Sequence, residues 1–208
     1  MIGTVNSFFI GIVATVIATA LGTLAALGLS RPNMPFKGLI MAILISPMIV
    51  PLIITAAGMF FFYARINLVY TFTGVILAHV ALATPFVVIT VTATLVGFDM
   101  NMVKAAQSLG ARPVKTFFRV IMPLILPGVI SGALFAFITS FDEVVIVMFM
   151  ASLDQLTIPK QMWAGIRQEI SPVILCMATC LVALSIFLLT TVELLRRRSE
   201  RLRGIKPR

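Results

Sequence analysis

The longest break in an otherwise apolar chain lies at residues 101–128, which read NMVKAAQSLGARPVKTFFRVIMPLILPG. The stretch has apolar residues at helical spacing, yet it also carries four basic side chains, Lys104, Arg112, Lys115 and Arg119. Continuous hydrophobic runs flank it on both sides. A basic, partly helical insert between such runs indicates a segment that contacts lipid or another protein at a membrane surface.

The composition is that of a helical membrane protein. Of the 208 residues, 60% are hydrophobic and 11% are charged, and the mean hydropathy is +1.12. Several runs reach the roughly 20 residues that a helix needs to cross a hydrocarbon core of about 30 Å. They are continuous and not alternating, unlike the strands of a membrane β-barrel. We therefore expect an all-α polytopic membrane protein, with a single transmembrane domain over residues 1–208.

The apolar runs predict five transmembrane helices, at residues 8–29, 38–62, 73–96, 124–150 and 172–194. In the first run, small residues at every fourth position form a seam for close helix packing: Ala14, Ala18, Gly22 and Ala26. Threonines beside the seam are able to hydrogen-bond across it: Thr15, Thr19 and Thr23. In the second run, Pro47 and Pro51 predict a bent or broken helix, which is either a structural kink or a bend that lines a pathway.

Basic residues divide unequally between the two sides of these five spans. Thirteen of the 16 Lys and Arg residues fall on one side, and Arg65, Lys160 and Arg167 fall on the other. The positive-inside rule places residues 98–123 and the basic tail, residues 195–208, in the cytoplasm. The basic tail is then expected to bind lipid headgroups and so to anchor the chain at the membrane surface. Because the basic residues cluster between and after the spans, the net charge of +9 does not indicate nucleic-acid binding.

Within residues 98–123 the capping signals predict a helix, a tight turn and a second helix. Asp99 or Asn101 is able to cap the first helix, which runs to Leu109, and Gly110 suits its C-terminus. Pro113 suits the first turn of the second helix. We expect this helical pair to lie on the cytoplasmic face.

These residues also carry a family resemblance. KAAQSLGARPVKTFFRVIMPLILPG resembles the cytoplasmic loop of binding-protein-dependent ABC transporter permeases, whose pattern reads Glu-Ala-Ala, three residues and Gly, with a hydrophobic-x-Leu-Pro ending further on. In that family the loop forms coupling helices that dock into a groove of the ATPase. The resemblance assigns the coupling role to Lys104, Ala105, Ala106, Leu109, Gly110, Arg112 and Pro113. Lys104 is a departure, because it stands where the family has glutamate; either the contact is weaker or the ATPase carries a compensating acid.

The resemblance extends over nearly the whole chain. Residues 130–150, ISGALFAFITSFDEVVIVMFM, and residues 156–172, LTIPKQMWAGIRQEISP, look like the spermidine/putrescine branch of these permeases. This similarity implies a type I ABC importer permease fold. Such permeases usually have six spans, so the usual first helix is expected to be lacking, either in a short variant or because it is missing from this sequence.

The resemblance also implies partners. The chain has no G-x-x-x-x-G-K-[ST] motif, so ATP and Mg²⁺ are expected on a separate ABC ATPase dimer, and no cofactor, metal or catalytic residue on this chain. A second permease is needed, with a heteromeric pair favoured, as is a periplasmic solute-binding protein that docks near residues 154–169. The expected location is the bacterial inner membrane, crossed several times, with transport by alternating access.

Ionisable residues inside membranes are candidates for a substrate pathway. Asp142 and Glu143 are expected in the outer half of the fourth span, where a cationic solute such as a polyamine, or an arginine of a neighbouring subunit, would balance them. His79 in the third span is a weaker candidate, because a lone histidine in such a helix is more often hydrogen-bonded to a neighbour than functional. The alternative function, a secondary transporter or channel that works alone, would use these three residues but would leave residues 101–128 without a role.

Overall fold

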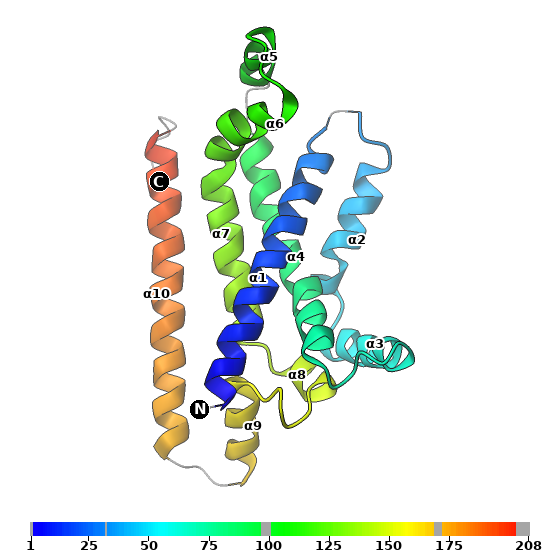
Figure 1. Cartoon of the computed structure of the whole chain (residues 1–208). Coiled ribbons are helices and arrows are strands. Elements are labelled where there is room, and N and C mark those ends of the chain that lie inside the picture. Colours follow the sequence, from blue (N-terminus) through cyan, green and yellow to red (C-terminus); the bar gives the residue numbers. More distant parts are fainter. Residues whose placement is uncertain (1, 32, 97–100, 169–171, 203–208) are drawn as a thin grey trace.

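The computed structural model describes residues 2–31, 33–96, 101–168 and 172–202, and all the regular structure in these ranges is helical. Three helices form the centre of the bundle: α1 (Ile2–Leu29), α4 (Phe72–Val96) and α7 (Met122–Phe141). A long outer helix, α10 (Pro172–Leu202), runs beside α7 (Figure 1). The predicted all-α membrane fold is confirmed, and in the described part of the chain three helical segments, residues 2–29, 72–96 and 113–141, are long and apolar enough to cross a membrane.

Small residues set the close packing of the three central helices. The predicted seam on α1 is confirmed, because Ala14, Ala18 and Ala26 have no exposed surface. A Cβ added to Gly22 would lie 2.6 Å from the Cβ of Val87 on α4. Backbones that approach this closely gain dispersion contacts. Such contacts drive helix association in a membrane, because the lipid tails are as apolar as the side chains and no hydrophobic effect favours contact between helices.

The second apolar run is broken, as its prolines predicted. It forms α2 (Lys37–Ile49) and α3 (Leu52–Arg65), which meet at an angle of 105°. Helix α2 continues through Pro47, and the break comes at Pro51, which precedes α3 in an extended conformation. Helix α3 therefore lies across one end of the bundle, where it packs against α8 (Val145–Met150) (Figure 1).

The prediction of one span over residues 124–150 is wrong. Helix α7 ends at Phe141, and the chain then turns into α8, which packs against α3 and α4. The apolar side chains of Ile146, Val147 and Met150 are buried in protein, so this part of the run serves the core and does not lengthen the span. Between the last two predicted spans, the chain contains a further helix, α9 (Ile158–Gln168).

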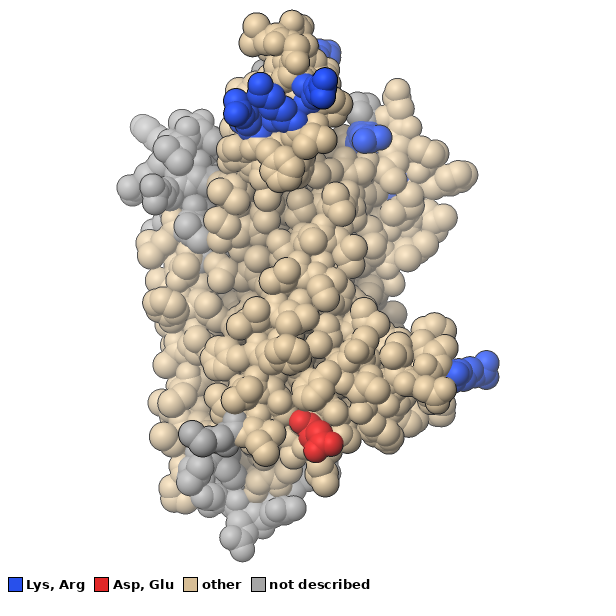
Figure 2. Space-filling model, in the orientation of Figure 1, with Lys and Arg blue, Asp and Glu red and all other residues tan. Residues whose placement is uncertain are grey.

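The predicted cytoplasmic segments lie at one end of the bundle. The connection from α1 to α2, the helices α5 (Asn101–Ser108) and α6 (Pro113–Thr116), and the end of α10 are all at this end (Figure 1). Lys and Arg side chains gather over α5 and α6 in Figure 2. Helices α3, α8 and α9 lie at the opposite end, so the arrangement agrees with the orientation that the charges predicted.

Candidate functional site

In the predicted coupling loop, residues 98–123, the first described helix is α5, which ends in a complete C-terminal cap. Gly110 adopts φ +78°, its N–H donates to the carbonyl of Gln107 (2.9 Å), and the N–H of Ala111 donates to the carbonyl of Ala106 (3.0 Å). These two bonds are those of a Schellman motif, which needs a residue in the left-handed region. The predicted helix with Gly110 at its C-terminus is confirmed, whereas Asp99, one of its two expected caps, lies outside the described residues.

The second helix of the loop continues into the membrane. Arg112 is extended (φ −65°, ψ 155°), and Pro113 opens α6, as predicted. The hydroxyl of the buried Thr116 donates to the Arg112 carbonyl (3.2 Å). A π-helical turn at Phe117–Ile121 then leads into α7 without a break. The span therefore begins well before the expected residue 124, and the loop and α7 are mechanically continuous.

The predicted coupling residues lie together at the tip of the molecule. Lys104, Ala105, Leu109, Gly110, Arg112 and Pro113 are exposed, and Ala106 is half-buried. Leu109 is 89% exposed, Val114 is 69% exposed and Met102 is 49% exposed. Apolar side chains on an otherwise polar protrusion are typical of a protein-binding surface, which is what a docking role requires.

The three residues predicted for a substrate pathway differ in their burial and their partners. His79 is buried in the bundle, where its Nδ1 lies 2.7 Å from the Ser140 Oγ and so links α4 to α7. Glu143 is buried, and its Oε1 accepts a hydrogen bond from the N–H of Ile146 (2.8 Å), where α8 begins. Burial raises the pKa of the Glu143 carboxyl, although its hydrogen bonds with backbone N–H groups oppose the shift. Asp142 is exposed, so of the acidic pair it is the one able to meet a solute.

A variant at Ser140 separates a structural role of His79 from a transport role. Ser140→Ala removes the Nδ1 partner of a fully buried imidazole, and we expect the complex in detergent to lose about 1–3 kcal/mol of stability. Uptake per assembled transporter should stay near that of the wild type. A thermal denaturation series checks the first expectation. Uptake that falls without loss of stability would instead place His79 in the pathway.

A polar clamp at the outer end was not found by sequence reasoning. The Asn6 Nδ2 donates to the carbonyls of Asp154 (2.7 Å) and Leu156 (3.0 Å), and the Ser7 Oγ accepts from the N–H of Ile158 (2.9 Å). The Lys160 Nζ donates to two carbonyls at the end of α8. These bonds hold the segment between α8 and α9 against α1. The available signal was a polar Asn-Ser pair at the start of an apolar run.

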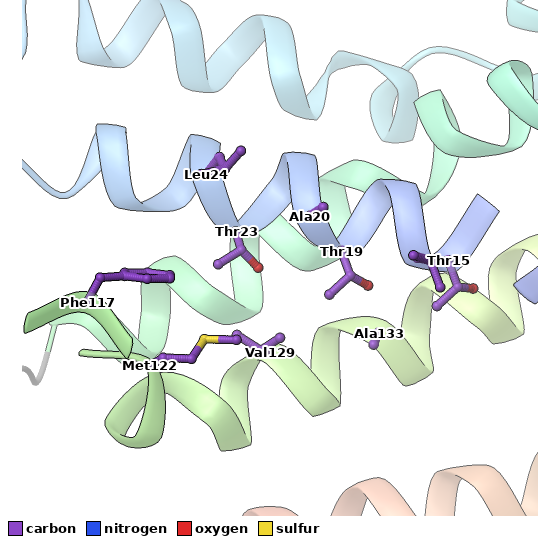
Figure 3. Close-up of a pocket in the computed structure, with 10 residues that line it drawn as sticks. Thr15, Thr19, Ala20, Thr23, Leu24, Phe117, Met122, Val129 and Ala133 are labelled. Carbon is purple, nitrogen blue, oxygen red and sulfur yellow. The ribbon is translucent and has the colours of Figure 1, made fainter. Parts of the chain in front are cut away.

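A second feature missed from the sequence is a pocket of about 490 Å³ between α1 and the start of α7. Thr15, Thr19 and Thr23 project from α1 toward α7 along its length (Figure 3). Phe117 and Met122 line it at the end nearer the coupling loop, and Val129 and Ala133 line it further along α7.

Comparisons with known proteins match nearly the whole chain. The family model for the inner membrane component of binding-protein-dependent transport systems matches residues 18–201. The spermidine/putrescine transport system permease protein PotC of Haemophilus influenzae is 30% identical over 196 residues, which cover 94% of this chain and 76% of that protein. The PotC of Escherichia coli K12 is 28% identical over 192 residues, which cover 92% and 73%. The putrescine transport system permease protein PotI of the same strain is 30% identical over 181 residues, which cover 83% and 64%.

Solved structures share the fold. A chain of the MetNI methionine ABC transporter in an inward-facing conformation superposes with a TM-score of 0.73 at 17% identity, covering 95% of this chain and 94% of that one. A chain of an amino acid ABC transporter crystallised with histidines gives a TM-score of 0.66 at 18% identity, covering 94% and 92%. At these identities the likeness concerns the fold alone.

Proposed function

Because this chain belongs to the family of inner membrane components of binding-protein-dependent transport systems, we propose that it carries a small aliphatic polyamine across the membrane. It is the membrane-spanning permease subunit of an ATP-driven importer, and in our proposal ATP is hydrolysed by a separate subunit. The observation that carries the choice of solute is the 30% identity over 94% of the chain to a spermidine/putrescine permease. The exposed carboxylate of Asp142, at the outer end of α7, is suited to a cationic solute.

The partners follow from the family in outline. A permease of this kind works with an ATPase and a solute-binding protein. In our proposal, an ATPase dimer receives the tip formed by α5 and α6 and binds the ATP and Mg²⁺. A second, different permease completes the pathway in the bacterial inner membrane, and the solute-binding protein docks near residues 154–169. Glu169 of that segment lies outside the described residues.

The coupling loop is built to transmit movement. Its cap at Gly110 fixes the angle between α5 and α6, and α6 continues into α7 through the π-helical turn. When the ATPase subunits close on ATP, a displacement of the tip is therefore passed on to α7, which we expect to tilt with it. Such a rigid-body rotation is a common route of alternating access.

Reconstitution with the cognate ATPase, second permease and binding protein tests this function. We expect ATP-dependent, vanadate-sensitive uptake of labelled putrescine or spermidine into proteoliposomes, and no uptake when the ATPase is left out. Uptake of an amino acid in place of polyamines would contradict the proposed solute. Uptake that continues without the ATPase would support a transporter that works alone.

Lys104 predicts the charge of its partner. Its side chain is exposed on α5, where the family has glutamate, and we expect an acidic group of the ATPase opposite it. Lys104→Glu would then place like charges together and lower solute-stimulated ATP hydrolysis about threefold to tenfold at low salt, with recovery as salt screens the charges. Lys37→Glu, at the exposed start of α2 and outside the tip, is the matched control for a change of net charge. A Lys104→Glu variant that binds the ATPase more tightly would contradict an acidic partner.

A further inference from the structure

The pocket between α1 and α7 has the size of a site for a small molecule. Its volume of about 490 Å³ is within the usual range for ligand pockets of roughly 300–1,000 Å³. Its wall is mainly hydrocarbon, from side chains such as Val16, Leu24 and Val129. A row of threonines on α1 lies along this wall, with the hydroxyl oxygens covered (Figure 3).

These threonine hydroxyls have no hydrogen-bond partner among the described residues. The Oγ1 atoms of Thr15, Thr19 and Thr23 are covered and unbonded, and Thr23 is only 6% exposed. Elsewhere, Thr84 and Thr94 each donate to the carbonyl four residues earlier, whereas the hydroxyls of Thr55, Thr92 and Thr157 are also covered and unbonded. The row on α1 differs from these because its three threonines line one pocket. Buried polar groups are rarely left unpaired, so three such hydroxyls on one helix face point to a ligand that completes them.

The spacing of the three threonines limits the distance between the polar groups of such a ligand. Successive threonines are four residues apart, which on a helix is a rise of about 6 Å. An extended aliphatic diamine with a four-carbon chain separates its two nitrogens by a similar length. Rotation about the Cα–Cβ bond exchanges the methyl and hydroxyl groups of a threonine, so each hydroxyl is able to turn toward a bound N–H group.

We propose that this pocket is a transit site for an extended diamine or triamine, in which Thr15, Thr19 and Thr23 accept hydrogen bonds from its nitrogens and the wall packs its methylene groups. The proposal rests on the proposed function and adds the residues that recognise the solute. Neutral hydroxyls suit a transit site, because a solute must be bound well enough to enter and weakly enough to leave.

Phe117 connects this site to the coupling loop. It lines the end of the pocket nearer the loop, and it is the first residue of the π-helical turn that joins α6 to α7. Its ring lies edge-on to that of Phe118, with centroids 4.9 Å apart. A displacement of α6 therefore moves a wall of the pocket, which ties release of the solute to movement of the ATPase.

Conservative threonine variants test the site in the complete reconstituted transporter. Valine keeps the shape of threonine without its hydroxyl, and serine keeps the hydroxyl. We expect Thr19→Val and Thr23→Val each to lower kcat/KM for putrescine and spermidine uptake about tenfold, because a hydrogen bond to a charged nitrogen is lost. Thr19→Ser and Thr23→Ser should stay within about twofold of the wild type. Thr179→Val, on α10, is the matched control, since the Thr179 hydroxyl donates to the carbonyl of Leu175 (2.8 Å).

The outcomes separate this site from the proposed function. Uptake of polyamines by the wild-type transporter tests the solute, and the comparison of valine with serine tests the site. Valine variants with wild-type kinetics would overturn the site and leave the pocket to a lipid chain or a helix of the second permease. Serine variants as impaired as the valine variants would also overturn it, because packing and not the hydroxyl would then be responsible.

Discussion

A Gly110→Asp transporter is expected to assemble with its ATPase and lose at least tenfold in uptake, because transport becomes uncoupled from ATP hydrolysis. A Cβ added at Gly110 meets no atom of this chain within 4 Å. Aspartate also tolerates the left-handed conformation that φ +78° requires. The variant therefore strains the turn at residue 110 without a steric clash, and we expect its main effect to come from a carboxylate placed in the contact with the ATPase, where an unpaired buried charge is costly.

Two further variants at Gly110 separate the effect of the added charge from the effect of straining the backbone turn. Gly110→Asn matches aspartate in shape and tolerance of positive φ, so it should retain most of the uptake. Gly110→Val strains the turn, because β-branched residues avoid this region, and it should reorient α5. The measurements are uptake and ATP hydrolysis on the same purified complexes. Wild-type uptake by Gly110→Asp would refute the docking role of the loop.

Features fixed by neighbouring residues could be predicted from the sequence. The turn at Gly110 and the helix start at Pro113 depend on the backbone preferences of those residues. The break at Pro51 has the same local origin. The small-residue seam of α1 was also predictable, since a helical repeat decides which residues share a face.

Features fixed by tertiary contacts could not be predicted. Residues 144–150 are as apolar as the preceding span, and hydropathy does not tell a core helix from a membrane crossing. The unbonded hydroxyls of Thr15, Thr19 and Thr23 are a second case. The sequence suggested that they bond across a seam, but that depends on what α7 places opposite them, and Val129 and Ala133 have no polar side-chain group to offer.

The turn between α7 and α8 leads to the last prediction, at Glu143. The Glu143 Oε1 accepts a hydrogen bond from the N–H of Ile146, and the residues that follow pack against α3 and α4. Glu143→Ala removes this cap and leaves a buried N–H without its partner. We expect a loss of about 1–2 kcal/mol of stability, seen as a lower midpoint of thermal unfolding in detergent and fewer assembled transporters.

Two controls assign separate roles to the acidic pair. Glu143→Gln keeps an oxygen in the same place and should restore most of the stability, because the cap needs an acceptor and not a charge. Asp142→Asn changes an exposed carboxylate, so assembly should be unaffected while the affinity for a cationic solute falls. If Glu143→Gln is as unstable as Glu143→Ala, the charge itself holds this turn. If Asp142→Asn leaves uptake unchanged, the solute does not depend on the Asp142 carboxylate, and the threonine row between α1 and α7 is left as the proposed recognition site.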